Sequence, residues 1–179
     1  MSGELLIVYL KAGEMHFTHE PSLVITVLGS CLSVTMHDRR RGIGGICHGL
    51  LPKCENKQSC TQDCREGFRY VECSILHMLR LFDKAGAKRS EIDVMCFGGA
   101  DMFSRNSRIP GLVSVGRQNV AMAEEILPRE GLTIKKRDVG GQGGRKIYFY
   151  TQNGEVLLKR LSVAGSTCKT VNTAGVASR

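Results

Sequence analysis

The sequence predicts a strand-rich α+β domain that carries two main helices. The chain has 179 residues, the length of one ordinary domain, and its 42% hydrophobic and 23% charged residues are typical of a protein with a buried core. Short runs rich in Leu, Ile and Val recur along the chain, whereas only two segments show helical spacing of apolar residues. Strands and helices do not alternate regularly, so an alternating parallel α/β fold is not expected.

The first half of the chain is predicted to consist mainly of strands. Residues 4–10 and 23–28 are apolar runs of strand length. Residues 31–37 and 43–50 are two more, and the polar turn between them favours an antiparallel hairpin. His16 and His19 fall in an early segment that we interpret as irregular. The polar segment 53–65 has no periodicity and is expected to form an exposed loop.

Helices are predicted in two places. The first begins near Phe68 and ends before Gly86, a residue type that favours helix C-termini. The second covers residues 117–127 and is bounded by Pro128 and Gly131. The remaining apolar runs are predicted strands, at residues 92–97, 132–139, 146–150 and 155–160. An Asn-Gly pair at 153–154 indicates a hairpin between the last two strands.

Several classes of protein are not expected from the composition. No stretch approaches the roughly 18 apolar residues of a membrane helix, and the N-terminal residues lack a basic leader and a small-residue cleavage site. We therefore expect a cytoplasmic protein without membrane insertion. The net charge of +8 favours an acidic protein partner, although solvated strand ends are the simpler interpretation. Nucleic acid is not expected, because there is no Trp and there are only four Tyr residues for base stacking.

Eight cysteines are many for a cytosolic domain, where disulfides are disfavoured. Cys47 and Cys96 lie in apolar runs and are expected to pack as small hydrophobic residues. Cys54, Cys60 and Cys64 could hold a structural zinc ion, but only the C-x3-C separation falls within the usual range. Unpaired thiols are the main interpretation, so no metal and no cofactor is predicted.

One cysteine and one histidine are placed for catalysis. Gly29 and Ser30 form a small-residue turn that presents Cys31, and its backbone N–H groups could stabilise an oxyanion. If residues 31–37 and 43–49 pair as a hairpin, Cys31 and His48 become cross-strand neighbours. A neighbouring imidazolium can lower the pKa of a thiol enough to hold a thiolate. Spacing alone, however, favours a buried cysteine and an unrelated histidine.

Sequence blocks shared with a known family favour the catalytic interpretation of Cys31 and His48 over the structural one. The segments 26–34 (TVLGSCLSV) and 48–52 (HGLLP) resemble the signature of the CheD family of chemoreceptor glutamine deamidases. Three further blocks follow in the family order, at residues 97–103 (FGGADMF), 115–120 (VGRQNV) and 138–146 (DVGGQGGRK). Five blocks in the right order are far more specific than any single motif.

The resemblance implies a fold, a reaction and a set of site residues. The expected fold is a three-layer α/β/β sandwich over residues 1–161, followed by a flexible tail at 162–179. Cys31 would be the nucleophile and His48 the base, with a threonine, Thr26, orienting the histidine; some relatives place that threonine at the position of Ile25. The implied substrates are glutamines in the cytoplasmic domains of methyl-accepting chemotaxis receptors, which are converted to glutamate with release of ammonia.

Two other functions stay open at this stage. The chain could be a chemotaxis binding module that engages a CheC-type phosphatase, or it could be an unrelated thiol hydrolase. The glycine-rich run 140–144 could cradle a phosphate, but it lies between two strands and no helix begins there, so a wide turn is favoured. By the resemblance, Gln142 and Arg145 in this block would contact the substrate.

Overall fold

The structure is a computed structural model that describes residues 5–55, 67–101, 113–161 and 170–171. Within these residues the chain forms two mixed five-stranded sheets. The outer sheet has the order β1-β3-β8-β9-β10, with strands Leu6–Tyr9, Ser22–Leu28, Arg145–Tyr150, Glu155–Arg160 and Thr170–Val171. The central sheet has the order β2-β5-β4-β6-β7, with strands Met15–Thr18, Ile43–Gly49, Leu32–Asp38, Ile92–Gly98 and Ile134–Val139.

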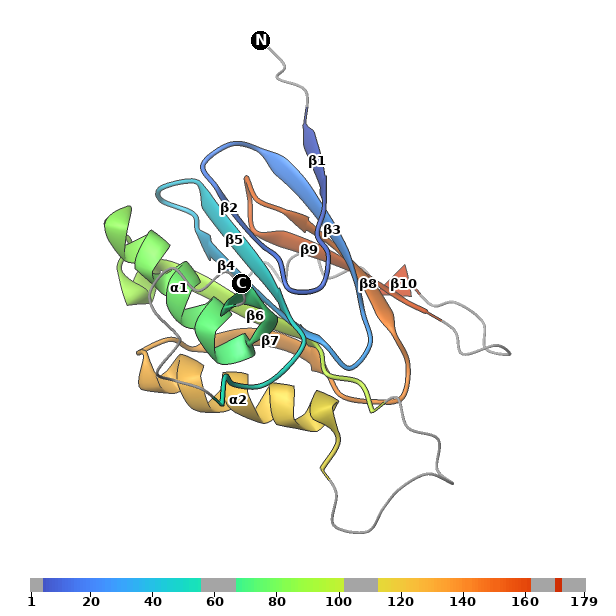
Figure 1. The fold of residues 1–179 in the computed structure, drawn as a ribbon. Helices are drawn as coiled ribbons and strands as arrows, with labels where there is room; N and C mark the ends of the chain where they lie inside the picture. The colour runs from blue at the N-terminus through green and yellow to red at the C-terminus, as the bar shows by residue number, and fades with distance from the viewer. Residues whose placement is uncertain (1–4, 56–66, 102–112, 162–169, 172–179) are drawn as a thin grey trace, which may run out of the picture.

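The two helices cover one face of the central sheet, and the outer sheet covers the other (Figure 1). Helix α1 spans Val71–Lys84 and helix α2 spans Val115–Arg129, and each presents an apolar stripe to the core. Short 3-10 turns at Gly67–Arg69 and Arg89–Glu91 precede α1 and β6. The predicted strand-rich α+β fold is therefore confirmed, with the layers in the order α/β/β.

The middle strands of the central sheet are buried on both faces, and this explains their composition. Every residue of β4 and β5 is buried. Because side chains alternate across a strand, Leu32, Val34 and Met36 pack against the helices, while the residues between them face the outer sheet. A second apolar core, which includes Ile46 and Phe97, fills the space between the two sheets.

Some elements differ from the sequence prediction. Residues 15–18 form β2, an edge strand paired with β5, where we expected irregular structure. The run Met-His-Phe-Thr alternates apolar and polar residues for only four positions, too few to stand out in a sequence. Helix α2 runs through Pro128 in its last turn and ends before Gly131, whose φ is +76°. Thr170–Val171 pair with β9, and the rest of the predicted tail lies outside the described residues, as does most of the predicted loop 53–65.

Candidate active site

The turn from β3 to β4 carries the chain from the outer sheet to the central sheet, and Gly29, Ser30 and Cys31 form this crossing. Cys31 is half-buried and packs at the edge of the core between the sheets. The turn is held by the segment that follows β6. The Gly99 N–H donates to the Cys31 carbonyl at 2.7 Å, and the Ala100 N–H donates to the Gly29 carbonyl at 2.8 Å. Cys31 is therefore presented from a backbone that is fixed on both sides.

His48 reaches the same layer from β5. The predicted hairpin of β4 and β5 is confirmed, and its register places Ser33 directly opposite His48. Cys31 precedes Ser33 by two residues, so it lies diagonally from His48 on the same face of the sheet. In regular pairing such diagonal neighbours are about 7–8 Å apart at the backbone, within reach of their side chains.

Thr26 on the inner face of β3 completes the arrangement. Its Oγ1 lies 2.8 Å from the His48 Nδ1 and also donates to the Leu10 carbonyl at 2.8 Å. A hydroxyl has only one hydrogen, and the Leu10 oxygen can only accept. The Nδ1 of His48 must therefore donate to Thr26. This tautomer leaves the Nε2 of His48 with a free lone pair, which is the form that a general base requires.

The backbone decides which residue ahead of the turn can contact the histidine. Successive side chains of β3 point to opposite faces of the outer sheet. Thr26 faces the space between the sheets, whereas Ile25 points to the other face of the outer sheet. The contact with His48 thus belongs to Thr26, and the alternative position at 25 cannot supply it.

Burial shifts the pKa values of both Cys31 and His48 toward their uncharged forms. Burial raises the pKa of the Cys31 thiol above its ordinary value of 9.0, and the Cys31 backbone N–H offsets part of this rise. Burial also lowers the pKa of His48 below 6.5, against the opposing effects of the Leu10 carbonyl and the Glu14 carboxylate. Both directions favour a thiol and a neutral imidazole at neutral pH over a thiolate–imidazolium pair.

Comparison with known proteins identifies the family. A family model described as CheD chemotactic sensory transduction matches residues 50–160. The chain belongs to the CheD family. A protein from Geobacter sulfurreducens named probable chemoreceptor glutamine deamidase CheD 2 is 46% identical over 155 residues, which are 87% of this chain and 90% of that protein. Probable chemoreceptor glutamine deamidases CheD from Maridesulfovibrio salexigens and Methanococcus maripaludis are similar as well. The Maridesulfovibrio salexigens protein is 36% identical, and the match covers 86% of this chain and 91% of that protein. The Methanococcus maripaludis protein is 30% identical, and the match covers 93% of this chain and 100% of that protein.

The sequence blocks that carry the CheD resemblance meet around the Cys31 turn. The block at 97–103 supplies Gly98, whose φ is +111° and whose added Cβ would lie 2.2 Å from the Cys31 carbonyl oxygen. The block at 115–120 supplies Asn119, which donates to the Ser30 carbonyl at 3.0 Å. In the block at 138–146 the Gly140 N–H donates to the Gly98 carbonyl at 2.9 Å. Sequence analysis found these blocks but gave no role to Gly98 or Asn119, since neither residue type is itself reactive.

Gln142 and Arg145 occupy different environments. Gln142 is exposed in the loop between β7 and β8, so its predicted contact with substrate stays a prediction. Arg145 is only 1% exposed. Its guanidinium donates to the carbonyls of Gly98 and Gly140 and lies 3.2 Å from the Asp138 carboxylate. This geometry favours support of the glycine segment beneath the turn.

The glycine-rich run forms a wide turn between β7 and β8, as favoured from the sequence. Gly140 and Gly141 both have positive φ angles, +75° and +73°, which only glycine adopts readily. The Gly141 carbonyl accepts from the Asp101 N–H at 2.7 Å. The turn therefore ties β7 and β8 to the segment that follows β6.

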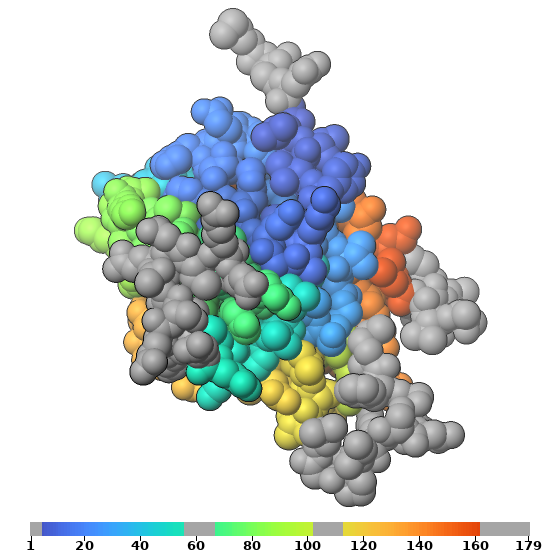
Figure 2. Space-filling view, in the orientation of Figure 1, coloured from blue at the N-terminus to red at the C-terminus, as the bar shows by residue number. Residues whose placement is uncertain are grey.

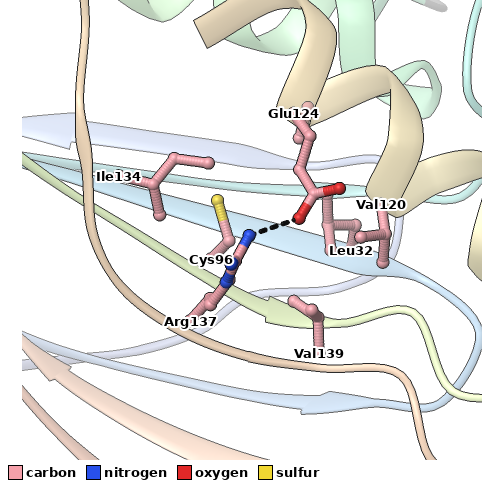
Figure 3. A pocket seen from close by; sticks show the side chains of 8 residues that line it. Leu32, Cys96, Val120, Glu124, Ile134, Arg137 and Val139 are labelled. Atoms are coloured by element: carbon pink, nitrogen blue, oxygen red, sulfur yellow. Dashed lines mark hydrogen bonds and ion pairs between the residues drawn. The ribbon is translucent and has the colours of Figure 1, made fainter. Parts of the chain in front are cut away.

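Two other cysteines have the packing role predicted for them. Cys47 and Cys96 are 1% and 4% exposed, and burial raises the pKa of each thiol to about 12. Cys96 lies at the base of a hollow under α2, where Arg137 and Glu124 form an ion pair at 2.7 Å (Figure 3). This hollow lies on the helix side of the central sheet, whereas Cys31 and His48 face the outer sheet.

Several basic residues at or near strand ends form ion pairs. Arg41 pairs with Asp38 and Glu91, and Arg160 pairs with Asp138. Lys135 pairs with Asp93. These contacts favour the simpler interpretation of the net charge, as charged side chains at strand ends. The described helices include none with the length and apolar character needed to cross a membrane.

The described part of the chain holds no group of three or more metal-ligating side chains. Cys60 and Cys64 of the zinc hypothesis lie outside the described residues.

Proposed function

We propose that the chain is a protein-glutamine deamidase of chemoreceptors, with Cys31 as nucleophile, His48 as general base and Thr26 as the residue that orients the base. The observation that supports this most directly is the chain of contacts from Leu10 through Thr26 to His48, which leaves Nε2 free on the face where Cys31 lies. The printed names of the CheD relatives supply the substrate class, a glutamine of a chemoreceptor.

The proposed reaction uses an uncharged resting pair. His48 Nε2 takes the proton of the Cys31 thiol as the sulfur attacks the carboxamide carbon of the substrate glutamine. Backbone N–H groups at Ser30 and Cys31 stabilise the oxyanion. The C–N bond breaks as His48 returns its proton to the departing nitrogen, which releases ammonia and leaves a thioester. Water then attacks the thioester through the same base, and glutamate and the Cys31 thiol are formed.

Replacement of the nucleophile tests the proposal. A chemoreceptor cytoplasmic fragment is incubated with the wild-type protein, and mass spectrometry follows the gain of about one dalton per converted glutamine together with the ammonia released. Cys31→Ala is expected to reduce both signals to background. Cys73→Ala on α1 serves as the control, because it removes a half-buried thiol outside the site and should keep full activity. Full activity of Cys31→Ala would contradict the proposal.

We further propose that the protein acts in the cytoplasm and that a CheC-type phosphatase binds the face around Cys31. In the space-filling view β3 and the turn after it, the segment after β5 and the start of α2 meet on one face of the molecule (Figure 2). If a CheC-type phosphatase covers this face, its addition should slow deamidation in proportion to the complex formed. Unchanged deamidation at saturating phosphatase would exclude a shared face.

A further inference from the structure

Asn119 on α2 is a polar side chain with no exposed surface, and it lies outside the Cys31, His48 and Thr26 arrangement. Its Nδ2 donates to the Ser30 carbonyl at 3.0 Å and to the Leu50 carbonyl at 2.9 Å. Both carbonyls can only accept, so the nitrogen side of the amide must face them. One side-chain amide thus joins the turn of the nucleophile to the segment that follows β5.

The contact with Ser30 sets the direction of a neighbouring donor. The Ser30 carbonyl and the Cys31 N–H belong to one trans peptide, in which the C=O and the N–H point in opposite directions. Because Asn119 holds the carbonyl toward the interior at α2, the Cys31 N–H is directed away from α2. Burial raises the pKa of the Cys31 thiol, and this N–H, directed toward the sulfur, offsets part of the rise. This is the direction that an oxyanion donor at the attacking sulfur requires.

The contact with Leu50 connects the end of the His48 strand to the side-chain amide of Asn119. Leu50 follows His48 by two residues at the end of β5, and its N–H is held by the Arg69 carbonyl at 2.8 Å. The Oδ1 of Asn119 is buried without a hydrogen-bond partner among the described residues. An unpaired buried acceptor is unfavourable, so packing alone does not account for an amide at this position.

We propose that Asn119 is a positioning residue for the deamidation. It holds the Ser30–Cys31 peptide in the orientation that directs the Cys31 N–H at the oxyanion, and it keeps this turn in register with the strand of His48. This inference rests on the proposed function, because it assigns a role in the same reaction.

The test separates transition-state stabilisation from stability. Asn119→Ala is compared with wild type in kcat and KM for the receptor fragment, in the rate at which iodoacetamide alkylates Cys31, and in the unfolding temperature. Alkylation needs the thiol but no oxyanion donor. We expect kcat to fall about 10- to 100-fold, less than the loss of a complete oxyanion donor. KM and the alkylation rate of Cys31, followed on its own peptide by mass spectrometry, should change less than about threefold.

Ser114→Ala is the matched control. Ser114 caps the N-terminus of the same helix by accepting from the Arg117 N–H, and among the described residues no hydrogen bond joins its side chain to the turn. Its loss should lower the unfolding temperature through α2 while leaving kcat near wild type. If Ser114→Ala loses as much kcat as Asn119→Ala at a similar unfolding temperature, Asn119 acts only through helix stability and the inference is overturned.

A second variant covers failure of the first to fold. Asn119→Asp keeps the shape of the side chain, and its protonated form offers one donor in place of two. If Asn119→Ala does not fold, the same two quantities, kcat and the alkylation rate of Cys31, are measured for Asn119→Asp. The inference expects kcat to fall while the alkylation rate changes little. Wild-type kcat in a folded Asn119 variant, with Cys31→Ala inactive, overturns this inference alone. Full activity of Cys31→Ala overturns the proposed function as well.

Discussion

A hydroxyl group carries a single hydrogen, and at Thr26 this hydrogen decides which nitrogen of His48 is free. The hydrogen is used on the Leu10 carbonyl, so the hydroxyl oxygen accepts from the Nδ1 of His48. Nε2 is then the basic nitrogen, on the face that Cys31 shares. At the scale of the residue, a main-chain carbonyl that no sequence motif records fixes the tautomer of the proposed base.

Removing this hydroxyl should disable the base without removing it. In Thr26→Val the Nδ1–H of His48 loses its buried acceptor, and the imidazole can take the other tautomer or turn away. We expect kcat for receptor deamidation to fall about 10- to 100-fold, part of the 10²–10⁴ that a positioned base contributes. Thr26→Ser keeps the hydroxyl and should retain most of the activity. Equal activities of the Val and Ser variants would contradict the orienting role.

The resting state of the pair can be read from its pH dependence. Burial raises the pKa of the Cys31 thiol above 9.0, so the alkylation rate of Cys31 should keep rising through pH 9. A thiolate–imidazolium pair would instead reach its plateau below neutral pH. The measurement is site-resolved alkylation by iodoacetamide from pH 5 to pH 10. A plateau at neutral pH would show that the thiol is ionised at rest.

At the scale of secondary-structure elements, the site depends on how closely the end of β6 approaches the turn after β3. Gly98 pairs with Leu32 in the central sheet, and its carbonyl accepts from both Arg145 and the Gly140 N–H. The backbone of Gly98 lies so close to the Cys31 carbonyl that a side chain at position 98 would not fit. Arg145 and the glycine-rich turn therefore support the segment that holds Cys31, the proposed nucleophile.

A single methyl group at Gly98 should disturb this contact. In Gly98→Ala the new Cβ would lie 2.2 Å from the Cys31 carbonyl oxygen, at a φ of +111°. Strain of this kind costs about 1–3 kcal/mol before any overlap is counted, and the turn itself must move. We expect a lower midpoint of urea unfolding together with a large loss of kcat.

Gly42→Ala is the control for backbone strain alone. Gly42 also has a positive φ, +65°, but nothing lies within 4 Å of an added Cβ. This variant should lose about 1–2 kcal/mol of stability and keep wild-type kcat. If Gly98→Ala has the same kcat as Gly42→Ala, the contact with Cys31 does not matter for the reaction.

At the scale of the whole molecule, two layers of sheet enclose polar groups that a single sheet would leave in water. His37 and His48 are 2% and 4% exposed on β4 and β5. His16 on β2 is partly buried beside them in the central sheet. Burial lowers the pKa of all three histidines below 6.5.

This burial predicts acid-sensitive stability. The unfolded chain takes up protons at its histidines near pH 6.5, while the folded protein resists protonation until lower pH. The stabilisation is therefore complete above pH 6.5 and is lost as the pH falls through the lowered values. The urea midpoint should fall steadily from pH 7.5 to pH 5. His37→Gln should weaken this dependence, because it removes one of the buried histidines. A midpoint that is constant over this range would contradict the prediction.

Much of the fold could be predicted from the chain alone, and so could the pairing of the strands beside the proposed reactive pair. Apolar runs identified β3 and β6, whereas β4 was recognisable as a strand from its alternation of apolar and polar residues. β2 was missed because four residues carry too little pattern. The hairpin of β4 and β5 placed Cys31 and His48 near each other, since the register of two adjoining strands follows from their turn.

What the sequence by itself determined is local: which segments are strands or helices, and which residue types can react. The tertiary structure decided everything that depends on distant segments. Leu10 and Thr26 meet His48 across two sheets, and Asn119 reaches Ser30 from a helix 89 residues away in sequence. The burial that raises the pKa of the Cys31 thiol is likewise a product of packed layers. Hydrogen bonds and desolvation depend on which residues lie close together in the folded protein. A local sequence pattern does not specify this for residues that are far apart in the chain.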